Sequence, residues 1–195
     1  YAYFFAHYRQ QILASRPIHR AVLERYLLLA NEVPGIALKT VLRPSPKTPG
    51  ATTLHIKIEP AKSSGAIQLD NQGATTSGPW QFLVQGQLPG LFSALGQTSL
   101  RLASTPSNTN ELLYASLSHR QLISAEGWLA GLDLSASKTE PGDPSLRTLE
   151  TRSHFRSIAA NLSYPLIRTG ERNLQLSGGL TRIRSTTSQL GANIT

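Results

Sequence analysis

The larger part of this chain alternates small or apolar residues with polar ones, which is the pattern of β-strands with two different faces. Compact turns and looser polar loops take turns between these stretches. We predict seven strands, near residues 64–72, 80–88, 97–104, 113–118, 127–137, 157–164 and 173–180. The first three alternate less cleanly than the others. An antiparallel meander with one apolar and one polar face is what a transmembrane β-barrel needs, because in lipid every backbone polar group must be paired.

A soluble β-sandwich also alternates, and it is the alternative for this part of the chain. The predicted apolar faces are rich in Ala, Leu and Gly, whereas a sandwich core uses tightly packing Val, Ile and Phe. The polar faces are rich in Ser, Asn, Gln and Arg, as the wall of a wet lumen would be. Both details favour the barrel.

The first sixty residues follow a different pattern, helix–helix–strand–strand. A stripe at helical spacing predicts the first helix and consists of Tyr1, Phe4, Phe5, Tyr8 and Ile12. The second helix is predicted over 17–31, with Pro17 as its first helical residue, and it ends before Gly35. Strands follow at 36–42 and 53–59. Because an α+β module of this kind needs about 75–80 residues, we expect a further strand upstream and a chain that is a fragment of a longer protein.

Composition excludes several classes of function. The net charge of +8 comes from 19 Lys and Arg against 11 Asp and Glu, but the arginines are scattered and form no stripe on a helix, so we expect no nucleic acid as partner. No run approaches the ~20 apolar residues of a transmembrane helix. The absence of Cys and Met from the sequence excludes a disulfide framework and a cysteine nucleophile.

Catalytic and metal-binding motifs are weak in this sequence. The five histidines are far apart and have no metal-ligand spacing. Ser135 and Lys138 spell S-x-x-K, which is catalytic where it opens a helix, but here it falls at the end of a predicted strand. We therefore expect no enzyme activity, no metal site and no cofactor.

Three segments together resemble one family. The run L-E-R-Y-L-L-L-A-N-E-V-P-G at 23–35 resembles the second helix of a POTRA domain. Asp70-Asn71-Gln72-Gly73, with Gly78 five residues on, resembles the signature where the family's barrel begins, and Y-P-L-I-R at 164–168 with N-L at 173–174 resembles a strand-and-turn segment. In this order they resemble the two-partner secretion transporters of the hemolysin secretion/activation family (ShlB, FhaC and HecB type), within the Omp85 superfamily.

The resemblance implies a mostly β fold, with residues 1–60 as the C-terminal part of a POTRA domain that lacks its first strand. Residues 61–195 would be the N-terminal portion of a transmembrane β-barrel, about seven strands. It implies type V secretion, in which an unfolded secreted exoprotein, such as a hemolysin or adhesin, is recognised and translocated through the barrel pore. The protein would lie in the Gram-negative outer membrane, with the POTRA module in the periplasm. The barrel would be monomeric and surrounded by outer-membrane lipid and lipopolysaccharide, and it would catalyse no reaction. The family's lumen loop with its Arg-Gly-Tyr core is not in this sequence. An Omp85-type factor that assembles other outer-membrane proteins is the alternative within transport.

The same topology assigns sides to the connections. Counted from Ser64, the segment Tyr164, Pro165 to Arg168 falls between the sixth and seventh strands and is expected to form a periplasmic turn. The longest polar loop, from Thr139 through Pro144, falls between the fifth and sixth and is expected outside.

Two further sets of residues are candidate sites. The resemblance implies that an incoming polypeptide pairs with the edge strand and the adjacent helix, at Ile36, Leu38, Lys39, Thr40 and Arg20. The alternative is an edge blunted by Lys39, Thr40 and Pro44. For the barrel-start motif, Asp70, Asn71, Gly73 and Gly78, turn geometry is favoured over contact with substrate, because these residue types form turns.

Overall fold

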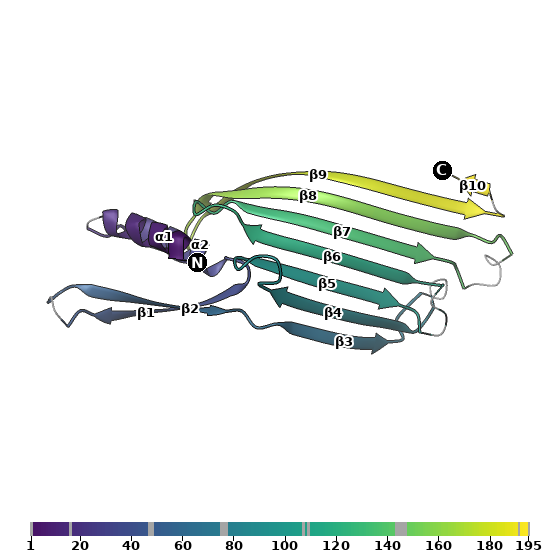
Figure 1. The fold of residues 1–195 in the computed structure, drawn as a ribbon, viewed down its shortest axis with the longest axis horizontal. Coiled ribbons are helices and arrows are strands. Elements are labelled where there is room, and N and C mark those ends of the chain that lie inside the picture. Colours follow the sequence, from purple (N-terminus) through teal and green to yellow (C-terminus); the bar gives the residue numbers. More distant parts are fainter. Residues whose placement is uncertain are drawn as a thin grey trace.

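The computed structural model consists of a small α/β module at one end of a long, curved antiparallel sheet (Figure 1). The structure describes residues 2–15, 17–46, 49–74, 78–106, 108, 110–142, 148–190 and 192–194. Tyr1, Asp143 and Pro144, which entered the expectations above, lie outside these residues. None of the helices in the described part of the chain is long and apolar enough to cross a membrane.

Two helices form one layer of the module. Helix α1 covers Ala2–Ala14, and helix α2 covers Arg20–Asn31. The expectation that Pro17 is the first helical residue is wrong. The backbone oxygen of His19 accepts hydrogen bonds from the amides of Val22 and Leu23, so the first helical turn closes at His19 and Pro17 stays outside the helix.

The other layer of the module is a two-stranded antiparallel sheet. Strand β1 covers Ile36–Pro44 and strand β2 covers Thr52–Pro60, so both are slightly longer than the alternation predicted. Gly35 turns the chain from α2 into β1 with a φ of +82°, a conformation that glycine adopts without strain. Its carbonyl accepts a hydrogen bond from the amide of Ala61, which closes the base of the hairpin.

The large sheet is a simple meander in which each strand pairs with its sequence neighbours. All seven predicted strands are present, and a short eighth strand at the end of the chain was not predicted. The strands are β3 Ser64–Asp70, β4 Gln81–Pro89, β5 Gly96–Ser104, β6 Leu113–Leu122, β7 Leu129–Thr139, β8 Arg152–Arg168, β9 Asn173–Gln189 and β10 Ala192–Ile194.

Strand register sorts the side chains of this sheet onto two faces. On one face, which we call the apolar face, a row of paired residues crosses four strands: Leu100, Leu117, Leu134 and Ile158. On the other, the polar face, a neighbouring row reads Arg101, Ser116, Ser135 and Ser157. Within the described residues no second layer covers the apolar face, and Ile67, Leu132 and Leu180 stand 73%, 42% and 83% exposed on it. A sandwich would bury such a face against a second sheet.

The segment Tyr164 to Arg168 is not itself a turn, contrary to the prediction. Strand β8 continues through it to Arg168, with a register irregularity between Pro165 and Ile167 where the ladder lacks the amide of Pro165. The turn follows, at 169–172, where the amide of Thr169 donates to the carbonyl of Arg172. It lies at the end of the sheet that carries the module (Figure 1).

The buried core joins the module to the sheet. One cluster packs Tyr8, Ile12 and Tyr26 of the helices against Ala125 of the β6–β7 turn. A second cluster packs Val33 and Ile36 against Leu95 and Leu122 at the ends of the β4–β5 and β6–β7 connections. The first cluster is thus mainly a core of the two helices, and the second is a core that the module shares with the turn end of the sheet.

Candidate functional site

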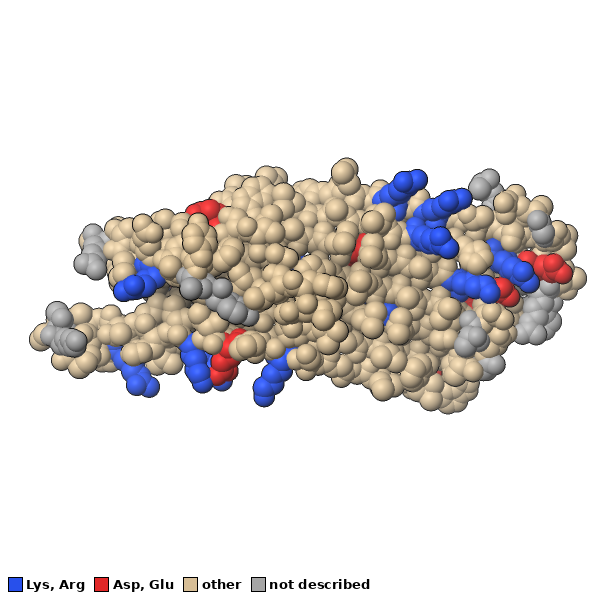
Figure 2. All heavy atoms as spheres, viewed as in Figure 1, with Lys and Arg blue, Asp and Glu red and all other residues tan. Residues whose placement is uncertain are grey.

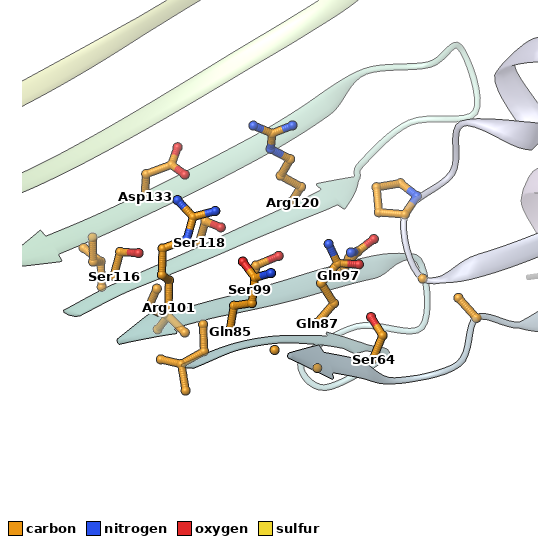
Figure 3. Close-up of a pocket in the computed structure, with 18 of the residues that line it drawn as sticks. Ser64, Gln85, Gln87, Gln97, Ser99, Arg101, Ser116, Ser118, Arg120 and Asp133 are labelled. Carbon is orange, nitrogen blue, oxygen red and sulfur yellow. The ribbon is translucent and has the colours of Figure 1, made fainter. Parts of the chain in front are cut away.

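A polar groove of about 890 Å³ lies between the module and the polar face of the sheet (Figure 3). The segment from Asn31 to Ile36, which links α2 to β1, forms one end of it. Side chains from strands β3 to β7 form its wall, and Figure 3 shows them directed into the same space: Ser64, Gln85, Gln87, Gln97, Ser99, Arg101, Ser116, Ser118, Arg120 and Asp133.

The side chains that form this wall are mostly amides and hydroxyls, which both donate and accept hydrogen bonds. In the described part of the chain, Arg101 and Arg120 make no ion pair, while Asp133 accepts a hydrogen bond from the Asn161 amide at 3.0 Å. Such a surface can contact an extended polypeptide backbone at many points and hold it strongly at none.

A second candidate region is the junction where α2 meets the end of β8. The Arg25 guanidinium donates hydrogen bonds to the backbone oxygens of Pro165 at 3.1 Å and Leu166 at 3.4 Å. About two turns further along, at the C-cap of the helix, Glu32 forms an ion pair with Arg168, in which Nε lies 2.8 Å from the carboxylate. These contacts hold one face of the helix against a backbone that Pro165 makes irregular.

The start of α2 contacts the β8–β9 turn in the same way. The amide of Gly170 donates to the Glu24 carboxylate at 3.2 Å, and Arg20 pairs with Glu24 at 2.5 Å and with Glu171 at 3.8 Å. The hydrogen bond from Arg20 and the one from Gly170 lower the pKa of Glu24 below its ordinary value. The carboxylate is thus charged where it anchors the turn.

Close packing completes the junction. Gly127, with a φ of +97°, lies where a Cβ atom would come 2.9 Å from Pro165 Cγ and 3.0 Å from Leu29 Cδ2. Next to it, the Trp128 and Tyr164 rings stack at 4.8 Å. Aromatic pairs at one end of an apolar face are typical of the interface girdle of membrane barrels.

Helix α1 reaches the same end of the sheet. His7 Nε2 lies 2.8 Å from the Glu126 carboxylate in the β6–β7 turn. Tyr8 beside it is 3% exposed, and its hydroxyl has no hydrogen-bond partner among the described residues. Burial, with a smaller contribution from Glu126, raises the pKa of Tyr8 to about 12.

The structure divides the predicted polypeptide-binding residues. Ile36 is buried in the shared core and Leu38 packs against it, whereas Lys39 and Thr40 are exposed on β1. Within the described residues β1 pairs only with β2, so its other edge is open. Arg20 is not part of this edge: its partners are Glu24 and Glu171, at the β8–β9 turn.

The barrel-start residues form a turn at the opposite end of the sheet from the module (Figure 1). Asp70 ends β3 and accepts a hydrogen bond from the amide of Gln72, and the amide of Gly73 donates to the carbonyl of Pro79. Asn71 is exposed between them. Gly78 has a φ of +85° and lies against the side chains of Thr105 and Glu111, where a Cβ atom would not fit.

Sequence reasoning did not identify Glu24, Arg25 and Glu32 as junction residues. All three lie within the L-E-R-Y-L-L-L-A-N-E-V-P-G run, and their partners lie in or directly after Y-P-L-I-R. The two motifs are in contact in the structure. Their presence together in one chain was therefore the signal that could have indicated the junction.

Comparison with known proteins supports the resemblance that these motifs indicate. The chain is 29% identical over 157 residues to the heme/hemopexin transporter protein HuxB of Haemophilus influenzae, a match that covers 80% of this chain and 27% of the relative. A HuxB sequence of a second strain, 86-028NP, is 28% identical over 148 residues, 75% of this chain and 26% of the relative. The chain thus spans about a quarter of the length of these relatives. No protein-family model matches it.

The fold resembles part of a solved structure. CdiB from Acinetobacter baumannii superimposes with a TM-score of 0.57 at 17% sequence identity, over 91% of this chain and 34% of CdiB. At this identity the likeness concerns the fold. It confirms that the chain is mostly β, with two helices and antiparallel sheets.

Proposed function

We propose that this chain is part of an outer-membrane transporter of the two-partner secretion type, which passes an unfolded secreted polypeptide through a β-barrel. The observation that carries the proposal is the sorting of a single antiparallel sheet into an exposed apolar face and a grooved polar face. Such a sheet is stable in lipid once closed, with the apolar face outward and the polar face toward a wet lumen.

The N-terminal module would be the POTRA-type entrance, in the periplasm. It caps the turn end of the sheet, and its linker segment 31–36 lies at the mouth of the polar groove. The open edge of β1 offers unpaired backbone groups that could add an extended cargo segment as a further strand, with little demand on cargo sequence. Exposed Lys39 and Thr40 would flank such a segment.

No bond is made or broken in this function. The polar wall lowers the cost of moving backbone groups through the barrel, because amide and hydroxyl side chains replace water as partners without binding tightly. The HuxB likeness supports transport as the activity; we take the cargo of this chain to be a secreted protein.

The proposal is tested with the complete gene product reconstituted in liposomes with a candidate exoprotein. Replacing two wall residues, Ser116→Leu and Ser118→Leu, should slow export several-fold, since an apolar wall binds cargo side chains and offers no hydrogen bonds. Ala115→Leu, on the apolar face of the same strand, is the matched control and should export normally. Equal export by all variants, or a complete gene product that stays monomeric in buffer without detergent, contradicts the proposal.

A further inference from the structure

The apolar face changes character at the end of the sheet opposite the module. On β8 and β9 its residues turn from apolar to basic: Arg156 pairs directly with Arg184, and Arg182 pairs with Ile158. All three arginines are exposed. We call Arg156, Arg182 and Arg184 the outer basic patch, and Figure 2 shows Lys and Arg side chains gathered over this part of β8 and β9.

Among the described residues, no acidic side chain pairs with the patch. In the described ranges none of the three arginines makes an ion pair. The nearby Glu140 carboxylate is already shared by two other cations, Lys138 at 3.0 Å and Arg152 at 3.4 Å. Like charges directly opposite one another on neighbouring strands repel, and guanidinium groups do not lose their proton to relieve it. The arrangement therefore favours an anion that bridges the two strands.

The patch begins where the apolar band ends. On β7 the apolar residues of this face run from Trp128 to Ala136, about 27 Å along the strand at roughly 3.4 Å per residue. At the tilt of about 40° usual in barrels this spans about 21 Å, so it fits within the ~25 Å lipid-facing band of outer-membrane proteins. Arg156 pairs with Ala136, the last apolar residue of the band on β7, so Arg156 and its partner Arg184 lie at the edge of the band. Arg182 lies one step further in, opposite Ile158, from where its long side chain can reach the headgroups.

We propose that the outer basic patch binds the phosphate groups of lipopolysaccharide in the outer leaflet. The inference rests on the proposed function, which puts the module in the periplasm and this end of the sheet outside. A guanidinium group can form two hydrogen bonds to the oxygens of one phosphate. Three arginines on two adjacent strands therefore suit a headgroup with more than one phosphate. The acyl chains of a lipid would also cover the neighbouring apolar residues, whereas a soluble anion would leave them exposed.

The test measures lipid retention by the complete gene product in detergent, by native mass spectrometry and by titration. The probes are bis-phosphorylated lipid A, dephosphorylated lipid A and inorganic phosphate. Each charge-assisted bond to a phosphate is worth about tenfold in affinity, so the double variant Arg156→Gln/Arg184→Gln should bind bis-phosphorylated lipid A about a hundredfold more weakly. The matched control, Arg101→Gln/Arg120→Gln, removes the same charge from the polar face and should retain wild-type affinity. Arg156→Lys/Arg184→Lys should recover part of it.

Three results would overturn the inference: equal loss in the polar-face control, equal binding of dephosphorylated lipid A, or a site that inorganic phosphate fills as readily as the lipid. A heat-dependent gel shift shows whether each variant forms a barrel. If wild-type protein forms a barrel and the patch variant still binds lipid A normally, the lipid site is wrong and the proposed transport function stands. If no barrel forms in wild-type protein, the proposed function fails first.

Discussion

Arg25 on helix α2 donates a hydrogen bond to the backbone oxygen of Pro165, 140 residues further along the chain, at 3.1 Å. This contact joins two motifs that are separate in sequence. Pro165 has no amide to offer the ladder, and the strand is irregular at this point, so its carbonyl is free to accept from the helix. Besides the buried clusters, the module is held to the sheet by the part of β8 that departs from regular pairing.

Removing this contact should loosen the module. Arg25→Ala loses the hydrogen bonds to Pro165 and Leu166, and we expect a cost of about 1 kcal/mol, because the group is partly solvated. Hydrogen exchange in α2 should rise while the strand amides stay protected. Arg9→Ala, an exposed arginine on α1, is the control. Unchanged exchange in α2 would show that the junction is held by apolar packing alone.

Packing at the junction can be tested through glycine. Gly127→Ala places a methyl group against Pro165 and Leu29, in addition to straining a positive φ, and should destabilise the junction by about 2–3 kcal/mol. Gly90→Ala separates the two effects, since Gly90 has a φ of +75° and open space around it. It should cost only about 1 kcal/mol. Thermal or urea unfolding measures both, and equal costs would mean that the close approach to Pro165 and Leu29 carries no energy.

The alternation of residues was enough to predict seven strands and the sorting of their faces, because a period of two follows directly from strand geometry. It could not predict where β8 ends. The strand count and the family resemblance predicted a turn at 164–168, yet the register resumes at Ile167 opposite Leu174. The start of α2 was also missed, since it depends on the carbonyl of His19 and not on a side-chain cap.

The candidate site was predicted only in part. Ile36 and Leu38 read as an edge strand open to cargo, but packing against Leu95 and Leu122 draws the start of that strand into the core. The local sequence does not indicate such a contact, because Leu95 and Leu122 lie 59 and 86 residues after Ile36. Arg20 was misplaced for the same reason: its partner Glu171 lies in a distant turn.

The buried Tyr8 hydroxyl makes the module sensitive to alkali. Its pKa of about 12 in the folded chain lies above the ordinary value of 10.0, so the neutral form stabilises the fold below pH 10 and this stability is lost as the pH rises toward 12. Tyr8→Phe should weaken that loss and raise stability near neutral pH by about 1 kcal/mol, since it removes a buried hydroxyl without a described partner.

The measurement is helix content against pH, together with tyrosinate absorbance. Tyr26 also has a raised pKa through burial, so Tyr8→Phe should reduce the alkaline transition without abolishing it. A destabilised Tyr8→Phe protein would show that the hydroxyl is satisfied, for example by water, and would contradict this account of the core.

The apolar face should not accept charge at mid-height. Leu132→Arg puts a guanidinium between His119 and Ala160 on that face, and barrel formation in lipid should be destabilised by about 2–4 kcal/mol. Ser135→Arg, three residues further along β7, points to the polar face and should cost less than about 1 kcal/mol. Folding into liposomes, followed by gel mobility, compares the two. Equal losses would mean that both faces meet the same solvent.

The central claim is that the two faces of this sheet meet lipid and water, and single cysteines test it most directly, because this chain contributes none of its own. Leu132→Cys, Asp133→Cys, Leu134→Cys and Ser135→Cys would be introduced one at a time into the complete gene product in liposomes. A water-soluble maleimide should label positions 133 and 135 and spare 132 and 134, whereas a lipid-borne nitroxide should quench a fluorophore only at 132 and 134. Labelling of all four positions alike, or with the two pairs reversed, would contradict the barrel wall.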